Sequence, residues 1–255
     1  MTPNSNVSLH KSIRRLLMAK PIAARKADVQ SKLAYAKHRH QELMNALFSA
    51  KKASSNPVFL VHACADIIST ARECFDYLGQ DIIEGYVVPN TTSAKIKKAH
   101  ADGTLKAYFP YFQSQLAKPD SIFFELKSHT PALYQDLLDF TSRIASKASI
   151  PDTLFNYQML ADVRDMVNEK KHDKLLAVVS EADAEFLVEN PSFSMILPIK
   201  GQKGWSSFEV QPGTKVERVT EYRFSFNDQE VGKFCLFATN ATERLILAVY
   251  ASHFA

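Results

Sequence analysis

Apolar residues recur at helical spacing through the first two-thirds of the chain. Over residues 22–53 they follow the i, i+3, i+4 pattern of an amphipathic helix. The residues of this stripe are Leu33, Ala36, Leu43, Ala46, Leu47 and Ala50. A second helix is predicted over residues 57–87, with Asn56 as its N-cap and Pro57 in its first turn. Its apolar arc is broad enough to pack on several neighbours, which predicts the central helix of a bundle.

Beyond this central helix the pattern changes from helical to strand-like. Helical spacing continues, with interruptions near Gly103 and Pro110, over residues 93–117, 131–147 and 153–170. After residue 173 the apolar period shortens to two, which is typical of strands with one buried face. The predicted strands cover residues 174–180, 192–200, 206–210, 216–226 and 230–237. Their short connections favour antiparallel pairing.

These elements predict an α+β protein. An N-terminal long-helix bundle, residues 1–172, is followed by a C-terminal antiparallel β-sheet and a terminal helix, residues 173–255. The terminal helix is expected from residue 244, with Asn240 as its cap and Glu243 three residues later. No linker separates the two parts, so we expect the sheet to pack on the bundle as one unit.

The composition excludes several classes of protein. The cysteines are few and scattered, which indicates buried thiols in a reducing compartment rather than a disulfide scaffold. They are Cys64, Cys74 and Cys235. No apolar stretch approaches the ~20 residues that span a bilayer, so we predict a cytoplasmic protein without membrane contact. In a eukaryote, the acid-free residues 1–27 would also suit a mitochondrial transit peptide.

The positive charge is concentrated at the N-terminal end. Residues 1–55 carry eleven Lys and Arg against Asp28 and Glu42, and residues 1–21 of this segment are expected to form a flexible or locally helical basic arm. Such a segment predicts a polyanion partner, docking on the acidic remainder of the chain, or a solvated helix face. The cations assigned to nucleic-acid binding are Arg14, Arg15, Arg25, Lys26, Arg39, Lys170 and Lys171.

Motifs for cofactors, metals and classical hydrolases are missing from the sequence. It contains no GxGxxG, GxxxxGK[ST], HExxH or GxSxG pattern. His38 and His40 lie two residues apart, which places them on different faces of a helix. We therefore predict no metal site and no cofactor.

One polar cluster has the geometry for chemistry on a phosphodiester. Arg164 and Asn168 are one helical turn apart, and His172 follows one turn later. The arginine would neutralise charge on a phosphate, the asparagine would orient it, and the histidine would move the proton. In the structural alternative these residues, with Lys170 and Lys171, simply complement the dipole at a helix C-terminus.

Two further sets of residues have both a structural and a functional interpretation. Arg72 and Asp76 are an i, i+4 pair on the central helix, either an ion pair locking two helices or groups facing the cleft of His172. An aromatic run around Pro110 would be core packing or a platform for stacking bases. Its members are Tyr108, Phe109, Tyr111, Phe112, Phe123 and Phe124.

The segments ARECFDYLGQDI and VNEKKHDKL resemble outlying bacterial members of the HEPN superfamily, over residues 56–175 at most. The matching positions are Ala71, Arg72, Phe75, Asp76, Tyr77, Leu78, Asn168, Lys171, His172 and Leu175. The resemblance implies a helical bundle, a homodimer and a metal-independent endoribonuclease whose motif joins an arginine, a polar neighbour and a histidine. Here seven residues separate Arg164 from His172, which departs from the four to six of that motif.

The resemblance thus implies an RNA-binding or RNA-cleaving protein in bacterial stress or phage defence. A second interpretation is a non-catalytic protein-interaction or scaffold protein with a degenerate HEPN-like bundle. A third is a protein with a small-molecule pocket between bundle and sheet. The role of His172 distinguishes the first two, because a catalytic histidine can be replaced without unfolding the protein.

Overall fold

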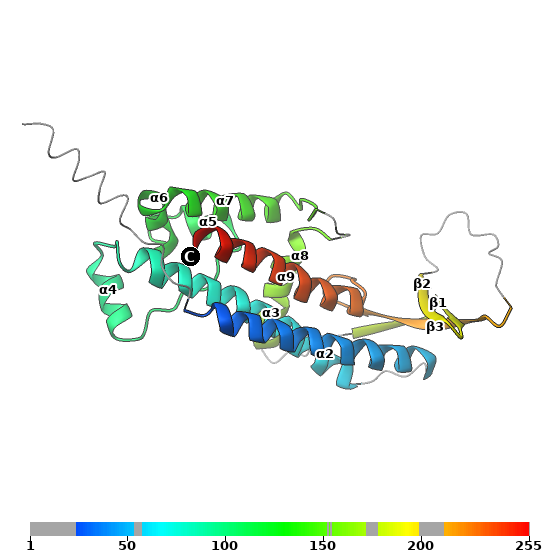
Figure 1. The fold of residues 1–255 in the computed structure, drawn as a ribbon. Helices are drawn as coiled ribbons and strands as arrows, with labels where there is room; N and C mark the ends of the chain where they lie inside the picture. Colours follow the sequence, from blue (N-terminus) through cyan, green and yellow to red (C-terminus); the bar gives the residue numbers. More distant parts are fainter. Residues whose placement is uncertain are drawn as a thin grey trace, which may run out of the picture. The chain divides into compact units, whose positions relative to one another are not determined.

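The computed structural model describes residues 24–53, 58–151, 153, 155–171, 178–198 and 212–254. These residues form an α+β protein, as the sequence predicts (Figure 1). The α-helices are α2 (Lys26–Ala53), α3 (Val58–Ile82), α4 (Ala94–Ala101), α5 (Gln113–Ala117), α6 (Leu126–His129), α7 (Pro131–Ala145), α8 (Gln158–Lys171) and α9 (Val231–His253). A π-helical segment, η1 (Ile83–Val87), extends α3, and a 3₁₀ segment, η2 (Ile122–Glu125), precedes α6.

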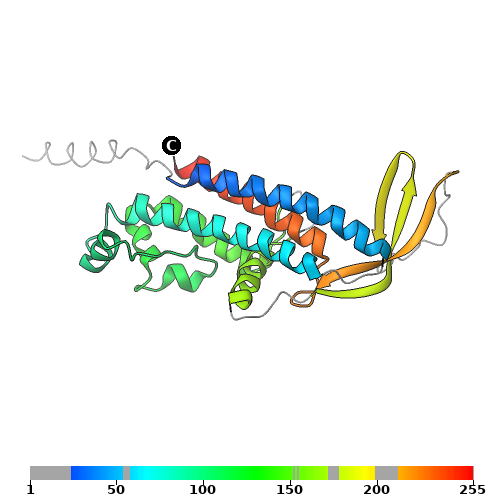
Figure 2. The same ribbon diagram turned by 90° about the horizontal axis from the view of Figure 1, so that it is seen from below.

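Three strands form one antiparallel sheet in the order β2-β1-β3. They are β1 (Val178–Asn190), β2 (Phe193–Pro198) and β3 (Lys215–Phe224). Figure 2 shows the twisted β1–β2 hairpin in yellow, with β3 in orange along the other edge of β1. Val188 of β1 pairs with Met195 of β2 and with Val216 of β3, which places these three side chains in one row across the sheet.

The prediction of a strand over residues 230–237 is wrong, because these residues form the first turns of α9. The buried positions there are Val231, Phe234, Cys235 and Ala238, and their spacing is helical. The Glu230 carboxylate accepts a hydrogen bond from the backbone N–H of Lys233 at 2.7 Å, which caps the helix start. Asn240 and Glu243 therefore lie inside α9 and do not begin a new helix. The predicted strand over residues 206–210 lies outside the described residues.

The chain divides into two compact units. Of the described residues, unit 1 comprises those in the ranges 24–29, 75–142 and 244–254, and unit 2 comprises those in the ranges 30–74 and 143–243. The packing of residues 173–255 on residues 1–172 stays a prediction. None of the helices in the described ranges is long and apolar enough to cross a membrane.

Half of the aromatic run around Pro110, namely Phe109, Tyr111 and Phe123, belongs to the core of unit 1. The ring of Phe75 lies 5.0 Å from that of Phe109 and 5.7 Å from that of Tyr111, centroid to centroid. A Cβ on Gly79 would come within 2.9 Å of the Phe109 backbone nitrogen, so residue 79 must lack a side chain for this segment to lie against α3. The structural interpretation thus holds for Phe109 and Tyr111, which are 1% and 0% exposed.

The core of unit 2 joins the sheet to the N-terminal half of α9. The Phe234 ring lies 5.5 Å from the ring of Phe224 on β3 and 5.9 Å from that of Phe237. The three cysteines are free thiols and buried, as predicted. Burial raises the pKa of Cys74 to about 12, so this thiol is not a reactive nucleophile.

Candidate functional site

The structure places two members of the predicted catalytic trio on α8. Arg164 donates a hydrogen bond from Nε to Asp165 Oδ1 at 2.8 Å, and its Nη2 also contacts that oxygen. Asn168 is half-buried one turn later. His172 and the side chains of Lys170 and Lys171 lie outside the described residues, so the assembly of the trio stays a prediction.

Arg25, a predicted nucleic-acid contact, holds two carboxylates of its own chain. Its guanidinium Nη1 lies 2.8 Å from Asp81 Oδ1 and 2.9 Å from Glu84 Oε2. The hydrogen bond to Glu84 raises the pKa of Arg25 above its usual range, and the same bond lowers the pKa of Glu84. A phosphate would have to compete with both acids for this arginine.

Three cations of α2 show the same pairing. Lys32 lies 2.7 Å from Glu73 of α3, and Lys37 lies 2.6 Å from Glu243 of α9. Arg39 pairs with Glu42. These contacts favour docking of the basic segment on the chain's own acids over a polyanion partner. Lys26 is exposed, and Arg14 and Arg15 lie outside the described residues.

The predicted ion pair on α3 also remains a prediction. Arg72 is 6% exposed, which agrees with the expected burial of its side chain. Asp76 accepts a hydrogen bond from the backbone N–H of Phe109 at 3.2 Å, which ties the aromatic run to α3. The homodimer that the HEPN resemblance implies stays a prediction as well.

A cationic surface that the sequence analysis missed lies in unit 1. Helix α4 has no buried residue, and its Lys95, Lys97 and Lys98 are all exposed. A helix of eight residues is too short to be stable by itself, but the Ser93 side chain caps its start, accepting from the Ile96 N–H. The Leu105 N–H donates to the Ala99 carbonyl at 2.9 Å, so the following residues continue directly from the end of α4.

Those residues lead into a surface hollow of about 330 Å³. Lys106, Tyr108 and Lys118 line it, together with Asp120 and polar groups of α5. Tyr108 is 55% exposed, whereas its neighbours Phe109 and Tyr111 are buried. Residue 108 faces solvent between the buried Ala107 and Phe109, which presents one aromatic ring in the hollow that Lys106 and Lys118 line.

We call Lys95, Lys97, Lys98, Lys106, Tyr108 and Lys118 the lysine–tyrosine surface. None of its lysines has a carboxylate within 4.0 Å in the described part of the chain, unlike Lys32, Lys37 and Arg39 of α2. Exposed cations beside an aromatic ring match the contacts that bind a single strand, phosphate to lysine and base to ring. The sequence offered a hint, since residues 94–118 hold five lysines and one acid, Asp102.

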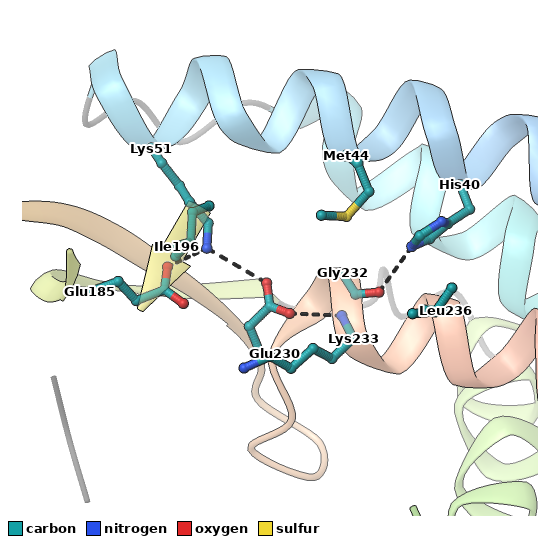
Figure 3. A pocket seen from close by; sticks show the side chains of 9 residues that line it. All are labelled: His40, Met44, Lys51, Glu185, Ile196, Glu230, Gly232, Lys233 and Leu236. Atoms are coloured by element: carbon teal, nitrogen blue, oxygen red, sulfur yellow. Dashed lines mark hydrogen bonds and ion pairs between the residues drawn. The ribbon is translucent and has the colours of Figure 1, made fainter. Parts of the chain in front are cut away.

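Unit 2 contains a second hollow, which surrounds a buried ion cluster (Figure 3). Lys51 of α2 contacts Glu185 of β1, and its Nζ lies 3.7 Å from Glu230 Oε1. These three side chains are 4%, 2% and 9% exposed. Burial raises the pKa of Glu185, the contact with Lys51 lowers it, and the nearby Glu230 raises it further. In the described ranges no three His, Cys, Asp or Glu side chains group as metal ligands do.

No model of a known protein family matches the chain, and no curated protein or solved structure is significantly similar to it. The geometry of the two hollows and the charges around them therefore carry the functional argument.

Proposed function

We propose that the protein binds single-stranded RNA through the lysine–tyrosine surface of unit 1. The observation that carries the proposal is the contrast between two sets of cations. Lys32, Lys37 and Arg39 of α2 are paired with carboxylates of the chain, whereas Lys95, Lys97, Lys98, Lys106 and Lys118 are exposed without such partners among the described residues. Counterions released from phosphates on binding to such lysines favour the complex at low salt.

Tyr108 supports a single strand as the ligand rather than a duplex. Bases are free to stack on an exposed ring only when they are unpaired. The ring lines the same hollow as Lys106 and Lys118, so one nucleotide can place its base on Tyr108 and its phosphate near a lysine. The choice of RNA over DNA rests on the HEPN resemblance.

Tyr108→Ala is expected to weaken RNA binding by about 5-fold to 100-fold, because stacking contributes ~1–3 kcal/mol per base. Tyr108→Phe keeps the ring and is expected to retain the affinity within about two-fold. Tyr35→Ala, at an aromatic residue of α2 that is 51% exposed, is the matched control. Fluorescence anisotropy with a labelled oligonucleotide measures all three. Equal loss in the two alanine variants would remove Tyr108 from the site.

RNA cleavage by Arg164, Asn168 and His172 is a separate proposal that rests on the resemblance alone. It requires Arg164 to exchange the Asp165 carboxylate for a phosphate. His172→Ala is then expected to slow cleavage by at least ~100-fold, since general acid–base catalysis contributes that much or more. His129→Ala, at an exposed histidine of α6, is the control. Intact RNA after incubation with the wild-type protein, or equal cleavage by His172→Ala, would refute it.

Protein interaction is the second candidate function, and one face of the sheet favours it. Phe193, Met195 and Val216 are 44%, 46% and 36% exposed. Met195 and Val216 flank Val188 in one row, and Phe193 lies two residues along β2 on the same face. Exposed apolar side chains gathered on one face are typical of contact surfaces. This function would take first place if the protein failed to bind RNA.

A further inference from the structure

The hollow in unit 2 is built from four elements around the buried ion cluster. Helix α2 contributes His40, Met44 and Lys51, and the two strands of the hairpin contribute Glu185 and Ile196. The start of α9 supplies the rest of the lining, namely Glu230, Gly232, Lys233 and Leu236. Its volume is about 230 Å³. This is below the ~300–1,000 Å³ of pockets for drug-sized ligands, so an occupant must be small.

One carboxylate oxygen of this hollow is left for water or a ligand to satisfy. Lys51 Nζ contacts Oε2 of Glu185, and the other carboxylate oxygen of Glu185 has no hydrogen-bond donor among the described residues. The side chain is 2% exposed, yet this oxygen is not cut off from the solvent in the hollow. A ligand N–H group can therefore take the place of water at this oxygen and donate to a negatively charged acceptor.

The charges around the hollow select the sign of that ligand. Its buried part holds two carboxylates, Glu185 and Glu230, against the single ammonium of Lys51. Lys233 also lines the hollow, but it is exposed and therefore screened by solvent and salt. The buried negative excess favours a cation that donates hydrogen bonds.

The remaining wall is apolar. Met44 and Leu236 face the hollow from two helices, and Ile196 faces it from β2 (Figure 3). A short hydrocarbon chain would pack against these three side chains while its charged end reached the carboxylates. The wall is also adaptable, because a methionine side chain changes shape easily.

We propose that this pocket binds a small primary ammonium compound, with the ammonium donating to Glu185 and its short hydrocarbon chain against Met44, Ile196 and Leu236. The site lies in unit 2 and does not depend on the RNA-binding proposal. No covalent step is involved, because the chemistry is ion pairing, hydrogen bonding and apolar burial.

Three probes of equal size test the proposal: n-butylammonium, n-butanol and n-butyrate. They are titrated into the protein with ¹³C-labelled methionine methyl groups, and the Met44 signal is followed by NMR. Butylammonium is expected to shift this signal with a dissociation constant in the millimolar range, as is usual for so small a ligand. The alcohol and the acid are expected to bind at least ~10-fold more weakly. Met195, exposed on β2, is the internal control and should not shift.

Two variants locate the binding. Glu185→Gln removes the buried negative charge and is expected to weaken butylammonium binding by about 10-fold, whereas Glu217→Gln, at an exposed position of β3, should not. A Cβ on Gly232 would lie 2.7 Å from the Met44 sulfur, so Gly232→Ala moves Met44 and narrows the hollow. Alanine suits a helix better than glycine, so this variant should fold and bind more weakly even if Glu185→Gln does not fold.

Equal binding of the three probes would overturn the proposal, because it would indicate an apolar hollow without charge selection. Failure of butylammonium to shift Met44 would overturn it as well. So would unchanged binding in Gly232→Ala.

Discussion

Replacing Lys95, Lys97 and Lys98 together by alanine is expected to lower the affinity for single-stranded RNA by about ten-fold or more at ~0.1 M salt. Each lysine that neutralises a phosphate contributes about 0.7 to the slope of log K against log salt for a single strand. The slope should therefore become shallower by about 2. Electrophoretic or anisotropy titrations over a series of salt concentrations measure both quantities.

The matched control removes the same number of charges from α2. Lys32→Ala, Lys37→Ala and Arg39→Ala together are expected to change RNA affinity by less than about two-fold, because each cation already faces a carboxylate of the chain. If this variant lost binding and the α4 variant kept it, the basic N-terminal segment would be the RNA site. The proposal for unit 1 would then be wrong.

Lys51→Met is expected to destabilise the protein by about 3–5 kcal/mol, because it leaves buried carboxylates without their cation. Glu185 and Glu230 are 2% and 9% exposed and cannot turn to solvent without opening the structure. Urea unfolding measures the free energy of unfolding. Lys37→Met is the control, since its ion pair with Glu243 is exposed and contributes ~1 kcal/mol or less.

This destabilisation should depend on pH with a defined sign. Burial already raises the pKa of Glu185 in the folded protein, and loss of Lys51 raises it further. A carboxyl whose folded pKa is raised favours folding below its unfolded pKa and loses that contribution as the pH rises through the folded value. The difference between Lys51→Met and the wild type should thus be smaller at pH 5 than at pH 8. A difference that grew toward acid pH would contradict the assignment of the charge to Glu185.

The helices were predictable from the sequence because their apolar residues recur at regular helical spacing. Helix-breaking glycine or proline residues also stand near their ends. Residues 93–117 show this, since Gly103 and Pro110 separate α4 from α5 as expected. Residues 230–237 show the limit. Their apolar residues fit the alternating pattern of a strand as well as the spacing of a helix. The helix is favoured by the packing of Phe234 against Phe224 of β3 and by the Glu230 side chain, which caps the helix start.

The candidate sites were less predictable, because they depend on pairings between distant residues. The excess of positive charge in the first 55 residues predicted that they contact a polyanion. In the folded protein, however, Lys32 and Lys37 form ion pairs with Glu73 and Glu243, which are far away in the sequence. Lys51 and Glu185 are 134 positions apart, and no local pattern links them. Tyr108 stands in a run that also contains the buried Phe109, Tyr111 and Phe123, and its exposure of 55% follows from the backbone path.

The most direct test of RNA binding in unit 1 is ultraviolet cross-linking of a single-stranded RNA to the full chain, followed by mass spectrometry of the cross-linked peptides. Binding at the lysine–tyrosine surface should give a dominant cross-link at Tyr108, accompanied by peptides that contain Lys106 or Lys118. Cross-links confined to residues 1–55 would contradict it, and so would a protein that forms none at low salt.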